Sequence, residues 1–128
     1  MRWDRRGWTA LAALSGLVSV AAGAFAAHGL ADPAAKDWMR TGATWQAIHA
    51  VAVLAVSALA VTGMPRARFS APLFLTASVL FSGSLYAMAM GAPRWLGAVT
   101  PIGGLLFIIG WAVLAWAAVS GGSESGAA

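Results

Sequence analysis

The residues of this sequence that could do chemistry are polar side chains placed within or beside apolar stretches: His28, Gln46, His49, Ser82, Tyr86 and Thr100. Gln46 and His49 lie three residues apart in the segment TWQAIHA (44–50), so they would share one face of a helix. Ser82 and Tyr86 lie four residues apart and would do the same. These side chains are our candidates for a polar network or a ligand site.

Catalysis and metal binding find little support in these residue types. The sequence has no cysteine, and its apolar stretches hold no Asp or Glu that could complete a catalytic triad or a zinc site. We therefore predict no catalytic residue, no metal site and no cofactor, and the pattern favours a protein that is not an enzyme. Because imidazoles from two helices can hold a haem iron, a haem-bearing electron carrier is kept as an alternative for His28 and His49.

The elements that carry these side chains are predicted from the charge pattern. The chain has 128 residues, of which 60% are hydrophobic and only 9% are charged, whereas about 25% of the residues of a soluble domain are charged. Charged residues are missing from four long stretches: 7–31, 41–65, 69–93 and 95–123. Each stretch exceeds the roughly 20 residues that a helix needs to cross a bilayer. We therefore predict an all-α integral membrane bundle of four transmembrane helices.

Capping signals refine the helix boundaries. Asp32-Pro33 and Thr100-Pro101 each place a proline directly after an N-cap residue. The first pair predicts a short amphipathic helical segment over 33–40, in the first outer connection. Within a single membrane domain over residues 1–128, the transmembrane helices are predicted at about 8–30, 41–63, 70–91 and 101–119.

The two ends of the chain carry separate expectations. The N-terminus combines basic residues, an apolar stretch and the small-residue pattern Ala24-Phe25-Ala26, which resembles a secretory signal peptide. Its apolar stretch is longer than the usual 7–15 residues or so, so we expect a retained first helix, with cleavage as the alternative. The small, polar tail over 120–128 is predicted to be disordered.

The distribution of basic residues predicts the orientation. Four crossings place both termini on one side, together with most of the basic residues: Arg2, Arg5, Arg6, Arg66 and Arg68. Fewer lie on the other side: Lys36, Arg40 and Arg94. By the positive-inside rule we predict a protein of the bacterial inner (cytoplasmic) membrane with both termini in the cytoplasm. The net charge of +4 then reflects orientation, and we predict no nucleic-acid partner.

The polar candidates gather toward the outer ends of the predicted helices, with His49 about 10 Å below the outer surface. An unpaired polar group in hydrocarbon costs a few kcal/mol, so these side chains should face one another. Such a cluster is either a hydrogen-bond network that fixes helix packing or the lining of a small pocket. Small residues that allow close helix approach are predicted to lie at helix interfaces, namely Gly23, Gly83, Gly103 and Gly104.

These features predict a multi-pass, non-enzymatic membrane protein. It would bind a lipid-like or small amphiphilic molecule at the outer-leaflet cluster, or act as an accessory subunit. The predicted partners are membrane lipids and either further copies of the chain or a larger membrane assembly. The alternative is an oligomeric transporter or channel for a small solute or ion, because one four-helix bundle with an apolar inner half would not conduct alone.

Four segments carry a resemblance to a known family: GAFAAHGL (23–30), TGATWQAIHAVAVL (41–54), FSGSLYAMAMG (81–91) and LGAVTPIGGLLFIIGW (96–111). They resemble the signature segments of the YgdD-like family, a group of small four-helix inner-membrane proteins labelled as a domain of unknown function. The resemblance extends from about Leu17 to Val119. It departs mildly at Ala26, where glycine is common, and at Trp45, where tyrosine is usual. It implies the four-helix fold and the inner-membrane location, and it names no ligand.

Overall fold

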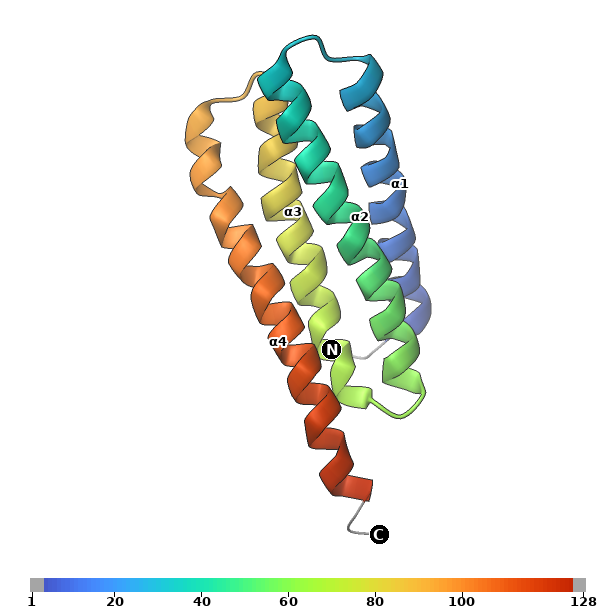
Figure 1. Cartoon of the computed structure of the whole chain (residues 1–128). Helices are drawn as coiled ribbons and strands as arrows, with labels where there is room; N and C mark the ends of the chain where they lie inside the picture. Colours follow the sequence, from blue (N-terminus) through green and yellow to red (C-terminus); the bar gives the residue numbers. More distant parts are fainter. Residues whose placement is uncertain (1–3, 126–128) are drawn as a thin grey trace.

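The computed structural model describes residues 4–125, with side chains described for residues 4–121. Four long helices and two short 3-10 helices follow one another along the chain (Figure 1): α1 (Arg5–His28), α2 (Pro33–Val61), η1 (Pro65–Phe69), α3 (Ser70–Ala89), η2 (Arg94–Ala98) and α4 (Thr100–Ser125). No strand occurs in this part of the chain.

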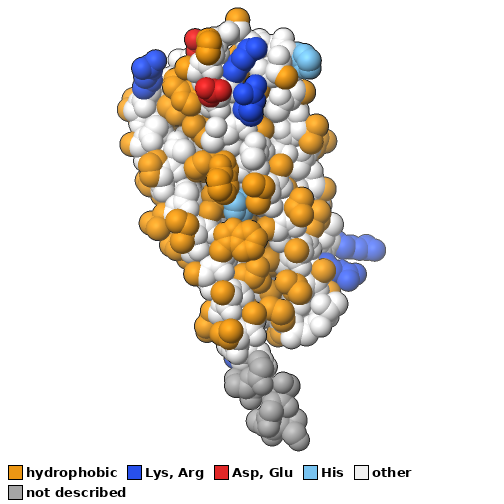
Figure 2. All heavy atoms as spheres, in the orientation of Figure 1, with side chains coloured by type: hydrophobic (Ala, Val, Ile, Leu, Met, Phe, Trp, Pro, Cys, Tyr) orange, Lys and Arg blue, Asp and Glu red, His pale blue; other side chains and the backbone are white. Residues whose placement is uncertain are grey.

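The four long helices are each long and apolar enough to cross a membrane. In Figure 2, hydrophobic side chains cover the middle of the visible face, and charged side chains gather toward its two ends. This distribution matches a bilayer whose hydrocarbon core lies between two charged surfaces. The predicted all-α bundle of four transmembrane helices is confirmed.

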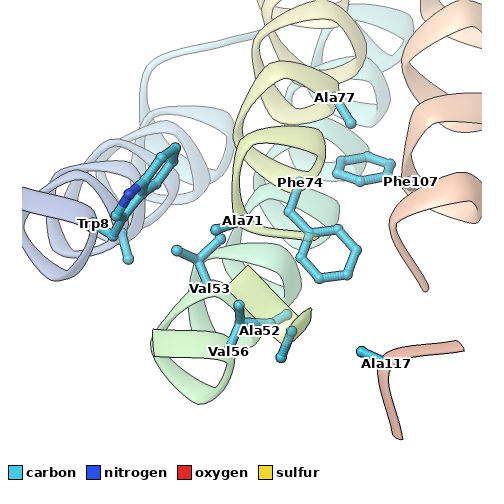
Figure 3. Packing of buried hydrophobic residues seen from close by; sticks show 11 residues of the cluster. Trp8, Ala52, Val53, Val56, Ala71, Phe74, Ala77, Phe107 and Ala117 are labelled. Carbon is cyan, nitrogen blue, oxygen red and sulfur yellow. The ribbon is translucent and has the colours of Figure 1, made fainter. Parts of the chain in front are cut away.

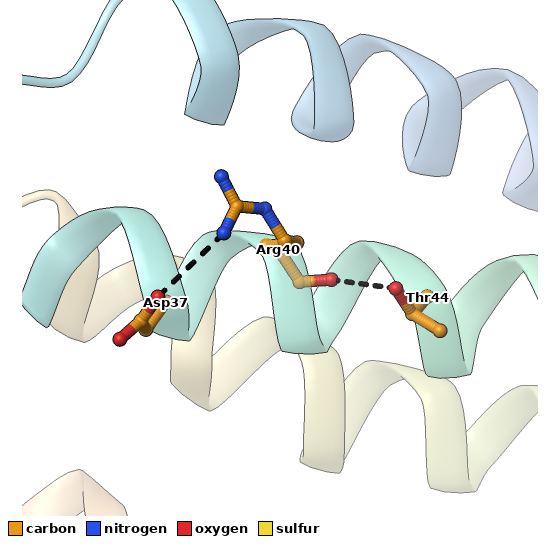
Figure 4. Close-up of polar contacts among 3 residues, drawn as sticks. All are labelled: Asp37, Arg40 and Thr44. Atoms are coloured by element: carbon orange, nitrogen blue, oxygen red, sulfur yellow. Dashed lines mark hydrogen bonds and ion pairs between the residues drawn. The ribbon is translucent and has the colours of Figure 1, made fainter. Parts of the chain in front are cut away.

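α2 begins earlier than the predicted transmembrane helix. The side chain of Asp32 accepts a hydrogen bond from the backbone N–H of Ala35 at 3.0 Å, and Pro33 takes the first helical position. The helix then continues through Gly42 without a break, so the predicted segment over 33–40 is the first part of α2. Figure 4 shows the N-terminal part of α2, where the Arg40 guanidinium lies 3.7 Å from the Asp37 carboxylate and the Arg40 carbonyl accepts from the Thr44 hydroxyl at 2.9 Å.

α4 extends further than predicted at its C-terminal end. It continues to Ser125, so residues 120–125 are helical where a disordered tail was predicted, and residues 126–128 lie outside the described residues. The Arg66 guanidinium contributes to this extension, because it donates to the Ser120 carbonyl at 3.5 Å and lies 5.4 Å from the centre of the Trp116 ring. Once a helix is formed, each further residue also adds a hydrogen bond at little cost.

The helices pack mainly in chain order, α1 on α2, α2 on α3 and α3 on α4, with only slight contact between α1 and α3. α1 and α4 therefore lie on opposite sides of the central α2–α3 pair (Figure 1). The beginning of α1 and the end of α4 lie at the same end of the molecule. This arrangement leaves one hollow between α1 and α3 and another between α2 and α4.

Figure 3 shows the apolar core of the half of the molecule toward the termini. Val53 and Val56 of α2 meet Phe74 of α3, with Trp8 from α1 and Ala117 from α4 at the sides. Val53, Val56 and Phe74 are completely buried. This core holds the central helix pair rigidly beneath the polar groups described below.

The predicted packing glycines differ in their surroundings. A methyl group on Gly103 would lie 2.7 Å from the Phe81 Cβ, so α3 and α4 approach closely only because residue 103 has no side chain. A methyl group on Gly23 would lie 3.8 Å from the Ala43 Cβ, and one on Gly104 would lie 3.9 Å from the Phe81 ring, which are ordinary contact distances. A methyl group on Gly83 would meet nothing within 4 Å, so close helix packing does not require a glycine at this position.

Candidate functional site

The first polar group joins three helices through Gln46. The Tyr86 hydroxyl of α3 donates to Gln46 Oε1 at 2.6 Å, and Gln46 Nε2 donates to the Ser15 hydroxyl of α1 at 3.1 Å. We call Ser15, Gln46 and Tyr86 the Gln46 network. It satisfies a buried amide in the middle of a membrane protein, where an unpaired amide would be costly.

The glycine one turn before Gln46 brings α3 against α2. The Ser82 hydroxyl donates to the Gly42 carbonyl at 2.7 Å. A methyl group at residue 42 would lie 2.6 Å from the Tyr86 ring, so the ring packs closely against the backbone of α2 at Gly42. Gly42 thus positions Tyr86 to reach Gln46.

The second polar group is centred on His49, which is only 1% exposed. Its Nδ1 lies 2.7 Å from the Trp45 carbonyl, and the Trp111 indole N–H of α4 donates to its Nε2 at 3.0 Å. An indole nitrogen can only donate, so Nε2 must accept and the imidazole proton must be on Nδ1. We call Trp45, His49 and Trp111 the His49 network.

Aromatic rings enclose the His49 imidazole on several sides. Phe107 of α4 stacks on it with ring centres 3.6 Å apart, and the Phe74 ring lies at 5.2 Å. Trp45 stacks at 6.1 Å. With both ring nitrogens bonded within the chain, His49 has no nitrogen free to bind an iron atom in this arrangement, and the haem alternative has no support in its geometry.

The remaining candidates lie apart from these two networks. Thr100 is the first residue of α4 and shares a 2.6 Å hydrogen bond with the Ser84 hydroxyl of α3. His28 is the exposed last residue of α1 and makes no hydrogen bond within the described residues.

The hydrogen bonds therefore divide into separate groups the candidates that were predicted to form one polar cluster. The structure brings together Gln46, Tyr86 and Ser82, but it places His49 with Trp111 and leaves His28 at the surface. His49 lies nine residues beyond Arg40, about 13 Å further along α2. It is separated from the Gln46 network because Gln46 bonds to α1 and α3, whereas His49 bonds to α4.

The site candidates predicted from the sequence did not include the residues that contact them in the structure: Ser15, Trp45, Ser84, Phe107 and Trp111. One signal was available for Trp111. Tryptophan in membrane proteins favours the two interfaces, whereas Trp111 lies eleven residues into α4, in the middle of the span. A mid-span indole N–H needs an acceptor, and that requirement points to a polar partner on a neighbouring helix.

Two hollows flank the central helix pair. The α1–α3 groove, of about 340 Å³, has Gln46 and Ser15 in its lining. The larger α2–α4 groove, of about 570 Å³, lies over the His49 network and is almost entirely apolar and aromatic; its lining residues are Trp45, His49, Phe81, Pro101, Gly104, Leu105, Phe107, Ile108 and Trp111. Its volume lies within the range of about 300–1,000 Å³ that is typical of ligand pockets in proteins.

Comparison with known proteins gives consistent matches. Residues 22–104 match the family described as "Protein of unknown function (DUF423)". A UPF0382 membrane protein of Haemophilus influenzae is 49% identical over 109 residues, which cover 83% of this chain and 88% of the relative. A UPF0382 membrane protein of Schizosaccharomyces pombe is 41% identical over 114 residues, 81% of this chain and 94% of the relative.

The UPF0382 inner membrane protein YgdD of Escherichia coli is 38% identical over 107 residues, 80% of this chain and 82% of the relative. No solved structure matches the chain.

Proposed function

The chain belongs to the DUF423 family of membrane proteins, and on that premise we propose that it is a non-enzymatic membrane protein that binds a membrane lipid in the α2–α4 groove. The observation that carries the proposal is the groove itself, an aromatic hollow of about 570 Å³ above a buried, fully bonded histidine. Aromatic rings offer large apolar contact area with few rotatable bonds.

The dimensions of the groove suit one lipid chain. Its lining extends from Pro101 to Trp111 along α4, about 15 Å at 1.5 Å per residue. That length equals half of a roughly 30 Å hydrocarbon core, the depth of one leaflet. An acyl chain in the groove would contact α2, α3 and α4 together. An acyl chain against a single helix elsewhere on the surface would make fewer contacts.

The groove opens in the leaflet next to the α2 N-terminus, Lys36 and Arg40. We place this leaflet outside the cell, because more Lys and Arg lie at the opposite end and because the Escherichia coli relative is named an inner membrane protein. In this orientation the protein holds an outer-leaflet lipid of the bacterial inner membrane, with both termini in the cytoplasm.

A groove-filling substitution tests the function. Gly104 lines the groove, and a Cβ there would meet Phe81 at an ordinary contact distance of 3.9 Å, so we expect Gly104→Leu to fill the hollow. Gly83→Leu is the matched control, because it adds the same side chain at a helical glycine with open space around it. Native mass spectrometry of protein purified in mild detergent measures the lipid that each variant retains.

We expect wild type and Gly83→Leu to retain lipid at a defined ratio and Gly104→Leu to lose most of it. Equal retention by both variants would contradict the proposal. Solute flux into proteoliposomes above that of empty vesicles, combined with no retained lipid, would favour the oligomeric transporter or channel instead.

A further inference from the structure

Trp45 provides the one polar side-chain atom of the α2–α4 groove that has no partner among residues 4–121. His49 and Trp111 satisfy each other, and the other lining side chains are apolar. The Trp45 ring is held by stacking on His49 and Phe107, with ring centres 6.1 and 6.5 Å apart, yet the residue stays 44% exposed. Its indole N–H makes no hydrogen bond within the described chain.

The depth of Trp45 identifies what could accept this hydrogen bond. Trp45 lies five residues beyond Arg40, about 7 Å further into the membrane. The headgroup and interfacial layer is about 5–7 Å thick on each side of the hydrocarbon core. Trp45 therefore lies at the base of this layer, where the ester carbonyls of a glycerolipid join its chains to its headgroup. Phosphates lie further out, level with Arg40, and saturated chains offer no acceptor.

Resting on the proposed function, we propose that the groove selects an ester-linked diacyl glycerolipid, whose chain carbonyl accepts a hydrogen bond from the Trp45 indole. The acyl chain then continues along Phe81, Phe107 and Ile108 toward Trp111. Trp45 is the specificity-determining residue of the site, and the rigid stack on His49 holds its ring in place before the lipid arrives. A ring that is already ordered loses little conformational freedom on binding.

The test compares two lipids that differ only in the carbonyl. Purified protein is incubated with equal amounts of diacyl and dialkyl phosphatidylcholine of the same chain lengths, and native mass spectrometry resolves the two complexes by mass. The ether lipid keeps the chains and headgroup but has no ester carbonyl. We expect wild type to favour the ester lipid by roughly three- to tenfold, the range of one neutral hydrogen bond.

Trp45→Phe keeps an aromatic ring and removes the N–H, so we expect it to bind both lipids equally. Trp95→Phe is the control, because Trp95 is 68% exposed in η2 and does not line the groove; it should keep the wild-type preference. A wild type without preference, or a Trp45→Phe variant that keeps the preference, would overturn the inference. If Gly104→Leu still loses both lipids in that case, the proposed function stands and only the role of Trp45 fails.

Discussion

At the level of single residues, His49 combines two roles that are usually separate in a membrane protein. Its ring stacks on Phe107, and its Nε2 connects α2 to α4 by accepting the hydrogen bond from Trp111, while its Nδ1 bonds to the Trp45 carbonyl of its own helix. The backbones of α2 and α4 do not pack directly on each other. The hydrogen bond from Trp111 is thus the polar link across the floor of the groove.

Replacing His49 with leucine should lower the stability of the protein. The change leaves the Trp111 indole N–H without an acceptor, and we expect a loss of about 1–2 kcal/mol in the free energy of unfolding. Thermal unfolding in detergent measures it. The control is Ser57→Ala on the same helix, because the Ser57 hydroxyl is buried and has no hydrogen-bond partner, so its removal should be neutral or slightly stabilising. Equal losses for the two variants would mean that the His49 network contributes nothing specific.

A double-mutant cycle can test whether the two polar networks are separate. Tyr86→Phe and Gln46→Leu remove the two partners of one 2.6 Å hydrogen bond, so their effects on stability should couple by about 0.6 kcal/mol and at most about 1.7. Tyr86→Phe combined with His49→Leu should be additive, because no hydrogen bond joins the two networks. Coupling of similar size in both cycles would show that the single cluster predicted from the sequence exists after all.

At the level of the helices, close approach of backbones positions the polar groups. α3 lies between α2 and α4, and it meets each of them where the facing residue is a glycine, Gly42 on α2 and Gly103 on α4. Between lipid-exposed helices there is no hydrophobic driving force, so such contacts must supply packing and hydrogen bonds instead. Ser82 and Ser84 of α3 then reach Gly42 and Thr100.

Two alanine substitutions separate packing glycines from exposed ones. Gly103→Ala places a methyl group against the Phe81 backbone, and overpacking of this kind typically costs about 1–3 kcal/mol. Gly83→Ala meets no neighbour and should be neutral or stabilising by up to about 1 kcal/mol, because alanine favours the helix. Denaturation in a common detergent gives the comparison. If Gly83→Ala lowers stability instead, Gly83 does lie at a helix interface, as the sequence predicted.

At the level of the whole molecule, the even number of crossings places the beginning of α1 and the end of α4 at one end. The native chain has no cysteine, so single cysteines report orientation without background. Ala34 and Thr62 are exposed at opposite ends of α2. In intact cells, Ala34→Cys should react with a membrane-impermeant thiol reagent, and Thr62→Cys should react only after lysis. The reverse pattern would place the termini, and the open leaflet of the groove, on the other side.

The charge pattern and the capping residues were enough to predict the class of protein and the order of its elements. Long stretches without charge leave a chain no alternative to membrane-spanning helices, because every backbone polar group in hydrocarbon must be bonded within its own segment. The cap at Asp32 follows from local backbone chemistry, and α2 begins directly after it. α4 begins at Thr100 itself, whose hydroxyl bonds to Ser84 of α3. Gln46, His49 and Tyr86 were correctly placed inside the bundle.

The pairing of the polar residues could not be predicted in the same way, because it depends on how the helices are packed. Position along a helix fixes which residues share a face, but the rotation and offset of one helix against another depend on close contacts far apart in sequence. Two close contacts set those offsets. The Phe81 backbone leaves room only for a glycine at residue 103, and the Tyr86 ring packs on Gly42. They direct Gln46 toward α1 and α3 and His49 toward α4. They also leave the groove between α2 and α4, which could not be predicted from any one helix alone.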